Sequence, residues 1–106
     1  MIVNRGEVWM IDTPFGEKPH LIVSNQQRNR ALDTVVCVRI TTSPNPPSIP
    51  SVIPIEDQGG SVVGRILCDE LFTIGKAQLS RRLSTGMLPR QMDRVCVGLR
   101  SALACL

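Results

Sequence analysis

Paired polar side chains in this 106-residue sequence have the types and spacing to act together. Each pair lies in a segment rich in β-formers, where alternate side chains face the same way. The cations could hold an anionic group, a hydroxyl could donate a hydrogen bond to it, and the imidazole pKa suits proton transfer near neutral pH. The pairs are Lys18 with His20, Arg39 with Thr41, and Arg65 with Asp69.

The composition is that of a globular protein with a mild positive charge. Hydrophobic residues make up 42% of the chain and charged residues 20%, so the chain should fold. The net charge of +3 permits an anionic partner without requiring one. The length predicts a single domain, residues 1–106.

The sequence offers no obvious metal site or membrane anchor. Its four cysteines are widely spaced and it has one histidine, so we expect no metal and no other cofactor, and interpret the cysteines as small buried hydrophobes. The N-terminus lacks a basic region followed by a long apolar run, and no stretch approaches the length of a membrane span. We therefore expect a cytoplasmic protein without membrane contact.

The first half of the chain predicts strands and one short polar segment. Strands are expected at 6–12, 19–24 and 34–41, the third from its alternating pattern. The turn-rich stretch 13–19 should leave the sheet as an exposed loop with Lys18 at its root. Residues 25–33 are polar enough for a short helix or a loop.

The second half predicts more short strands and a helix. Residues 43–51 hold four of the eight prolines and favour an extended hairpin loop. An edge strand at 51–55, a turn at 57–60, a strand at 61–69, a turn-bearing connection at 72–76, a short strand at 79–83 and an amphipathic helix from Leu88 follow. This order favours a mainly β fold, a strongly bent sheet or small barrel with a C-terminal helix.

Several sequence blocks carry more information by their order than any one of them does alone. They are Arg5-Gly-Glu-Val-Trp9, Lys18-Pro-His-Leu-Ile-Val-Ser24, Val38-Arg-Ile-Thr-Thr-Ser43 and Val63-Gly-Arg-Ile-Leu-Cys-Asp69. The Thr73-Ile-Gly connection, the strand at 79–83 and the terminal helix follow in the same order. In this order the blocks resemble the MazF, PemK and Kid family of bacterial toxins, and the resemblance covers nearly the whole chain.

The resemblance implies an SH3-like small barrel of bent antiparallel strands and a homodimer. It also implies a metal-independent endoribonuclease that cleaves single-stranded RNA at short motifs and is inhibited by a cognate antitoxin. The chain departs from the family at Lys18, where an arginine usually precedes the proline, and at Leu67, where Kid-like members carry an arginine. Lysine keeps the charge but lacks the planar fork of arginine, and Arg65 could substitute for the second arginine.

The resemblance also suggests roles in catalysis. A metal-free ribonuclease uses the 2′-hydroxyl of RNA as the nucleophile, so it must accept that proton, stabilise charge on the phosphate and protonate the leaving 5′-oxygen. Lys18 would stabilise charge and could protonate the leaving group, and Thr41 would bind a nonbridging phosphate oxygen. Asp69 and Glu7 match carboxylates of Kid-like members and are both candidates for the general base, and either carboxylate could contact the edge of an RNA base instead.

The remaining candidates would bind RNA. Phe15, on the expected loop, could stack one base, and His20 shares strand parity with Lys18, so it could alternatively transfer a proton. With Glu7, Arg39 and Arg65 they complete the RNA-binding set.

Two other functions stay open. A toxin like CcdB shares the barrel and inhibits gyrase by binding, but its tryptophan near the C-terminus has no counterpart, because the one tryptophan here is Trp9. A catalytically silent SH3-like interaction module is favoured only by the lysine at position 18. The RNA motif, the target among messenger, ribosomal and transfer RNA, the antitoxin and the general base stay undetermined.

Overall fold

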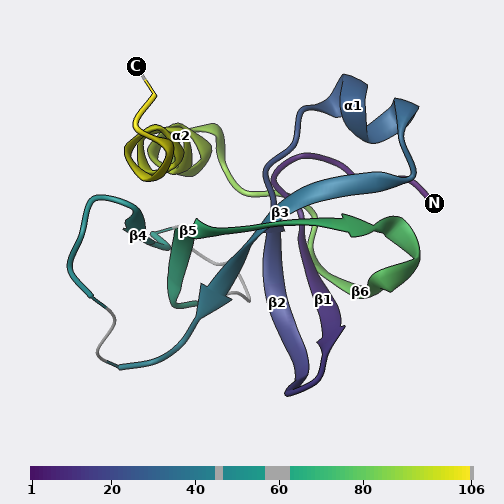
Figure 1. Cartoon of the computed structure of the whole chain (residues 1–106), viewed down its shortest axis with the longest axis horizontal. Helices are drawn as coiled ribbons and strands as arrows, with labels where there is room; N and C mark the ends of the chain where they lie inside the picture. The colour runs from purple at the N-terminus through teal and green to yellow at the C-terminus, as the bar shows by residue number, and fades with distance from the viewer. Residues whose placement is uncertain (45–46, 57–62, 106) are drawn as a thin grey trace.

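The computed structural model describes residues 1–44, 47–56 and 63–105, whose strands form one antiparallel sheet (Figure 1). The strands are β1 (Val8–Thr13), β2 (Gly16–Ile22), β3 (Thr34–Thr41), β4 (Val52–Pro54), β5 (Arg65–Gly75) and β6 (Leu79–Ser84). Their spatial order is β4-β5-β3-β2-β1-β6. The mainly β fold is therefore confirmed, but β4 and β6 are the two edges of a sheet that does not close into a barrel.

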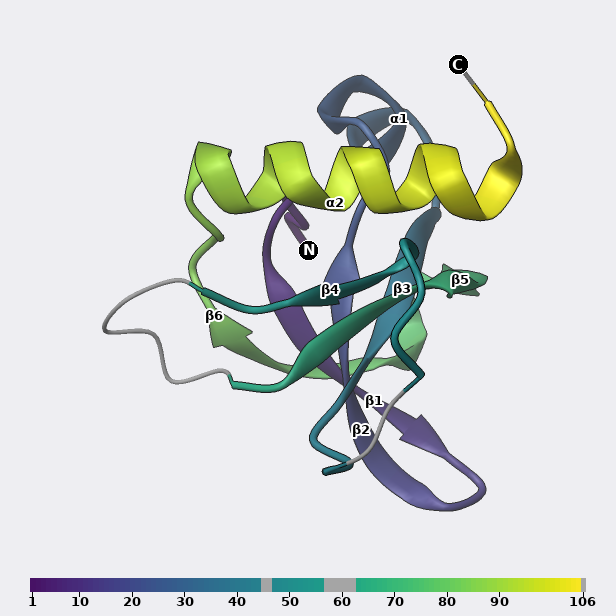
Figure 2. The ribbon, with the colours of Figure 1, turned by 90° about the vertical axis from the view of Figure 1, so that its left-hand side faces the viewer.

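The predicted C-terminal helix is α2 (Pro89–Leu103), with proline in its first turn. It crosses one side of the sheet over β4 and β5 (Figure 2), where Val95 is fully buried. A Cβ at Gly98 would lie 2.8 Å from both the Cys68 Sγ and the Ile53 Cγ1, so glycine lets the helix approach the sheet closely. No described helix is long and apolar enough to cross a membrane.

The polar segment after β2 forms the short helix α1 (Gln26–Ala31), which begins where the Asn25 side chain accepts a hydrogen bond from the Arg28 N–H at 2.8 Å. A 3-10 turn, η1 (Lys76–Gln78), joins β5 to β6.

Apolar residues fill both faces of the bent sheet. One cluster, beneath α2, includes Val8, Leu21, Val38, Ile66, Cys68 and Val95, and the other includes Val3, Ile11, Ile22, Val35, Cys37 and Leu79. Burial raises the pKa of Cys37 to about 12 and that of Cys68 to about 11, so both stay protonated thiols. Cys105 is exposed, which corrects the prediction that every cysteine is buried.

The predicted loop at 13–19 is wrong, because these residues continue the hairpin. β1 and β2 pair as far as Thr13 with Gly16, and Lys18 pairs with Ile11 inside the ladder. The Thr13 hydroxyl closes the turn by donating to the Gly16 carbonyl at 2.6 Å. Gly16 has a φ of +99°, which glycine adopts without strain. Lys18 is thus held by a strand that projects from the sheet (Figure 2).

The predicted connection at 72–76 is also wrong, since β5 continues through Gly75, which pairs with Thr34. The ladder with β3 is interrupted instead: Val38 pairs with Leu71, but the next residue, Arg39, pairs with Leu67. A bulge of residues 68–70 lies opposite this step, and β5 turns a corner there (Figure 1).

The other strand boundaries shift little. The edge strand expected at 51–55 is β4, and β6 matches the strand expected at 79–83. The strand expected at 61–69 begins at Arg65 among the described residues, whereas the turn at 57–60 and part of the hairpin loop at 43–51 lie outside them.

Candidate active site

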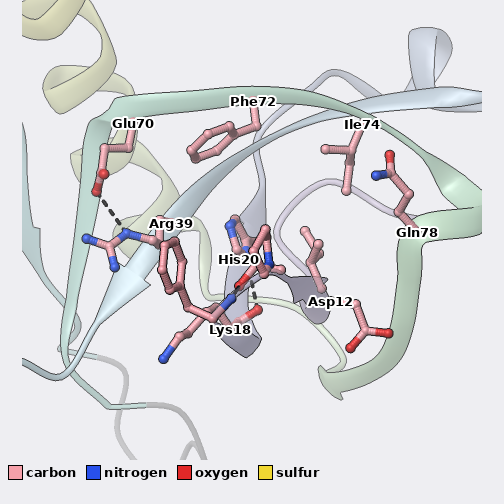
Figure 3. A pocket seen from close by; sticks show the side chains of 12 residues that line it. Asp12, Lys18, His20, Arg39, Glu70, Phe72, Ile74 and Gln78 are labelled. Atoms are coloured by element: carbon pink, nitrogen blue, oxygen red, sulfur yellow. Dashed lines mark hydrogen bonds and ion pairs between the residues drawn. The ribbon is translucent and has the colours of Figure 1, made fainter.

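A pocket of about 600 Å³ opens between the β1–β2 hairpin and the far half of β5. Figure 3 shows Glu70 pointing from β5 toward Arg39 on β3, with Phe72 and Ile74 further along β5 and His20 of β2 across the pocket from them. Four of the sequence-based candidates line it, namely Phe15, Lys18, His20 and Arg39. The pocket residues that the sequence analysis missed include Asp12, Glu70, Phe72 and Gln78.

The pairing of β2 with β3 brings the cations together. Lys18 and His20 share one face of β2 as predicted, and His20 lies directly opposite Arg39 on β3. The pairing of β2 with β3 ends at His20 and Arg39. Lys18 precedes His20 by two residues and Thr41 follows Arg39 by two, so both lie just beyond this end of the pairing. Lys18 and Thr41 therefore lie on the same two strands as His20 and Arg39, at the same end of the pairing.

The surroundings of His20 favour one tautomer and the neutral form of its ring. His20 is only 4% exposed, and its Nδ1 lies 2.9 Å from the Lys18 carbonyl oxygen, which can only accept, so Nδ1 carries the proton and Nε2 is the basic atom. Burial lowers the pKa of His20 below its usual value, and the charge of Arg39 lowers it further, against the carbonyl contact and Glu70. The ring is therefore neutral at pH 7, and its edge meets Phe72 with centroids 5.8 Å apart.

Glu70 reaches Arg39 because of the bulge in β5. Its Oε2 accepts a hydrogen bond from the Arg39 Nε at 2.9 Å, and both side chains are more than a third exposed. Alternation along a regular strand places Glu70 and Asp69 on opposite faces, but it does not say which residue of β3 lies beside Glu70. No local sequence signal marked the bulge, so only the structure reveals this ion pair.

The other four candidates, Thr41, Arg65, Asp69 and Glu7, lie outside the pocket. Thr41 ends β3 opposite Arg65, and its Oγ1 accepts a hydrogen bond from the Ser43 N–H at 3.1 Å. Arg65 lines a different hollow, beside Pro44 and Pro47. Asp69 is exposed in the bulge next to Glu70.

Glu7 holds the N-terminal turn together. It is 1% exposed, and its carboxylate accepts hydrogen bonds from the Asn4 backbone N–H at 2.8 Å and from the Trp9 Nε1 at 3.1 Å. It also accepts from the Asn4 Nδ2 at 3.3 Å and from the Arg82 NH1 at 3.1 Å. Every one of these contacts is internal, so the described structure gives Glu7 a role in stability and does not bring it to the pocket.

We expect Glu7→Ala to lower the free energy of unfolding by about 3 kcal/mol, because it leaves buried donors and part of the Arg82 guanidinium unpaired. Glu17→Ala is the matched control, since Glu17 pairs with Arg81 at 3.6 Å on the surface. It should cost less than about 1 kcal/mol. Urea unfolding of both variants measures the difference, and equal losses would contradict the buried role of Glu7.

The fold and the pocket define a small β protein in which a hairpin, a bent strand and a packed helix frame a site with two cations and one neutral imidazole. Residues 4–103 match the family described as PemK-like, MazF-like toxin of type II toxin-antitoxin system. The chain belongs to this family.

Similar proteins agree with this membership. The chain is 35% identical over 99 residues to the endoribonuclease MazF1 of Mycobacterium bovis and to the endoribonuclease MazF4 of Mycobacterium tuberculosis, covering 93% of this chain and 90% of each relative. A solved mycobacterial endoribonuclease in complex with its cognate antitoxin superposes with a TM-score of 0.87 at 34% identity, over 96% of this chain and 95% of that one. The MazE-MazF structure from Deinococcus radiodurans, at 17% identity and a TM-score of 0.81 over 100% and 99% of the two chains, shares the fold.

Proposed function

We propose that the chain is the toxin of a type II pair and cleaves single-stranded RNA at short sequence motifs. The observation that carries the proposal is the gathering of Lys18, His20 and Arg39 in one pocket of a chain whose relatives are endoribonucleases. Membership of the toxin family favours this function over a catalytically silent interaction module.

The proposed reaction is an attack within the RNA. The 2′-oxygen forms a bond to the adjacent phosphorus, the bond from phosphorus to the 5′-oxygen breaks, and the products carry a 2′,3′-cyclic phosphate and a 5′-hydroxyl. Lys18 and Arg39 supply positive charge to the phosphate as its negative charge grows, and the Thr41 hydroxyl donates to a nonbridging oxygen.

The proton leaving the 2′-hydroxyl needs an acceptor, and His20 is the group best supported by the geometry. It lines the same pocket as Lys18, and its lowered pKa keeps Nε2 unprotonated at neutral pH. Lys18 then gives a proton to the leaving 5′-oxygen. Asp69, which is exposed in the neighbouring bulge, is the alternative acceptor.

The proposal extends to the partners. A relative has been solved with its cognate antitoxin, and we propose that an antitoxin neutralises this chain in the cytoplasm, where its RNA substrate lies. We also propose a homodimer, for which α2 offers exposed apolar side chains at Val97 and Leu103.

We expect the purified protein to cut single-stranded RNA in excess EDTA, because lysine and arginine supply the charge that a metal would otherwise provide. Among the described residues, no group of three or more His, Cys, Asp or Glu side chains could hold a metal ion. Mapping the fragment ends should show 2′,3′-cyclic phosphates and 5′-hydroxyls. Cutting that stops on chelation and returns with Mg²⁺ would overturn the metal-free mechanism, and no cutting in either condition would overturn the nuclease.

A further inference from the structure

The Arg39–Glu70 pair presents further hydrogen-bonding groups to the pocket. The Arg39 Nε and the Glu70 Oε2 are joined at 2.9 Å, while within the described part of the chain the two terminal NH₂ groups of Arg39 and the Glu70 Oε1 have no hydrogen-bond partner. Since both side chains are more than a third exposed, a bound molecule can reach these atoms. The pair thus offers one acceptor beside a fork of donors.

Two exposed aromatic rings line the same pocket as this pair. Phe15, at the hairpin tip, is 86% exposed, Phe72 is 44% exposed, and both line the pocket with Arg39 and Glu70. Exposed aromatic rings near a cation are typical of sites where an unstacked nucleobase is sandwiched, because every base offers a π-face for stacking. Stacking holds a base without choosing it, so the choice falls to polar atoms at the base edge.

We propose that the Arg39–Glu70 pair selects one unpaired RNA base that carries an amino group next to an acceptor ring nitrogen on its Watson–Crick edge, namely cytosine or adenine. The Glu70 Oε1 would accept from the exocyclic amine, and one terminal NH₂ group of Arg39 would donate to the ring nitrogen, which leaves the other for the phosphate. The inference rests on the proposed function and adds to it a residue that determines specificity, Glu70.

The same arrangement rejects the other two bases. Uracil held in the pose of cytosine would place its O4 against the carboxylate and its N3–H against the donors of Arg39. Guanine held in the pose of adenine would place its O6 against the carboxylate and its N1–H against the same donors. Each mismatch leaves polar groups without partners inside a partly closed site, which typically costs about 1 to 3 kcal/mol, or roughly 5- to 150-fold in discrimination.

Replacing Glu70 tests the inference without unfolding the protein, because a partly exposed ion pair contributes little stability. Glu70→Gln keeps the size of the side chain but can turn either an oxygen or an NH₂ group toward the base. Glu17→Gln is the matched control, since Glu17 is a surface carboxylate paired with Arg81 outside the pocket.

The first measurement is the cleavage pattern on a pool of randomised RNA oligonucleotides. The wild type and Glu17→Gln should favour cytosine or adenine by about 10-fold or more at one position of the motif, and Glu70→Gln should reduce that preference to within about threefold. A wild type that cuts without such a preference, or a Glu70→Gln protein that keeps it, overturns the inference while leaving the nuclease function intact.

The second measurement does not depend on cleavage. Titrating the protein with cytidine, adenosine, uridine and guanosine 5′-monophosphates, while following the NMR signals of Phe15 and Phe72, should show tighter binding of cytidine or adenosine monophosphate. Glu70→Gln should remove that advantage, and this result would stand even if the protein cut no RNA. Equal binding of all four nucleotides, or signals that respond to the antitoxin and to no nucleotide, would overturn base selection by this pair.

Discussion

Replacing the ribose on the 5′ side of the scissile bond with deoxyribose is expected to abolish cleavage. The proposed reaction has no other nucleophile, because the 2′-oxygen itself must form the new bond to phosphorus. The pocket offers charge and an imidazole that would act on that hydroxyl. A single-deoxy oligonucleotide, incubated with the protein and analysed by gel, gives the measurement.

The control carries the deoxyribose at the next nucleotide along the same oligonucleotide, and it should be cut at nearly the normal rate. If the scissile deoxy substrate is cut as well, water is the nucleophile. The products would then end in a plain phosphate rather than a cyclic one.

Lys18→Ala is expected to slow cleavage by about 10² to 10³-fold, the usual cost of removing a charged group that acts mainly in the transition state. Lys18 lines the pocket from the projecting hairpin, where no ion pair holds it among the described residues. Thermal unfolding should therefore barely change. Single-turnover rates on one defined oligonucleotide would measure the loss.

Lys18→Arg separates charge from geometry. If Lys18 acts as a point charge, arginine should retain cleavage within about tenfold, or about 1.4 kcal/mol of transition-state stabilisation. Lys76→Ala is the control, because Lys76 lies in η1 outside this pocket and its removal should leave the rate unchanged. A Lys18→Ala protein that cuts at the wild-type rate would move the role to Arg39 or Arg65.

Much of the site could be predicted from local patterns in the sequence. Alternation along a strand correctly put Lys18 and His20 on one face, and apolar spacing with Pro89 gave the C-terminal helix. These features depend on neighbours in the chain, so they can be recognised without knowing the partner strand. The ordered sequence blocks also gave the family, which the match over residues 4–103 confirms.

Other features depended on contacts between distant segments, and only the tertiary structure decided them. The turn-rich stretch at 13–19 suggested a loop, but pairing with β1 extends β2 outward and places Lys18 in a strand. The sequence suggested Glu7 for RNA binding or as the general base, whereas in the structure its buried carboxylate accepts hydrogen bonds from Arg82, which is 75 residues away, and from Trp9 and Asn4.

The sequence by itself determined most of the strands, the C-terminal helix, the family and the cations of the pocket, because strand alternation and helical spacing are local. The structure decided that β5 bulges at residues 68–70, that Glu70 therefore meets Arg39, and that the sheet stays open. A bulge is a mismatch between the lengths of two paired strands, and it is defined only once both strands and their register are known.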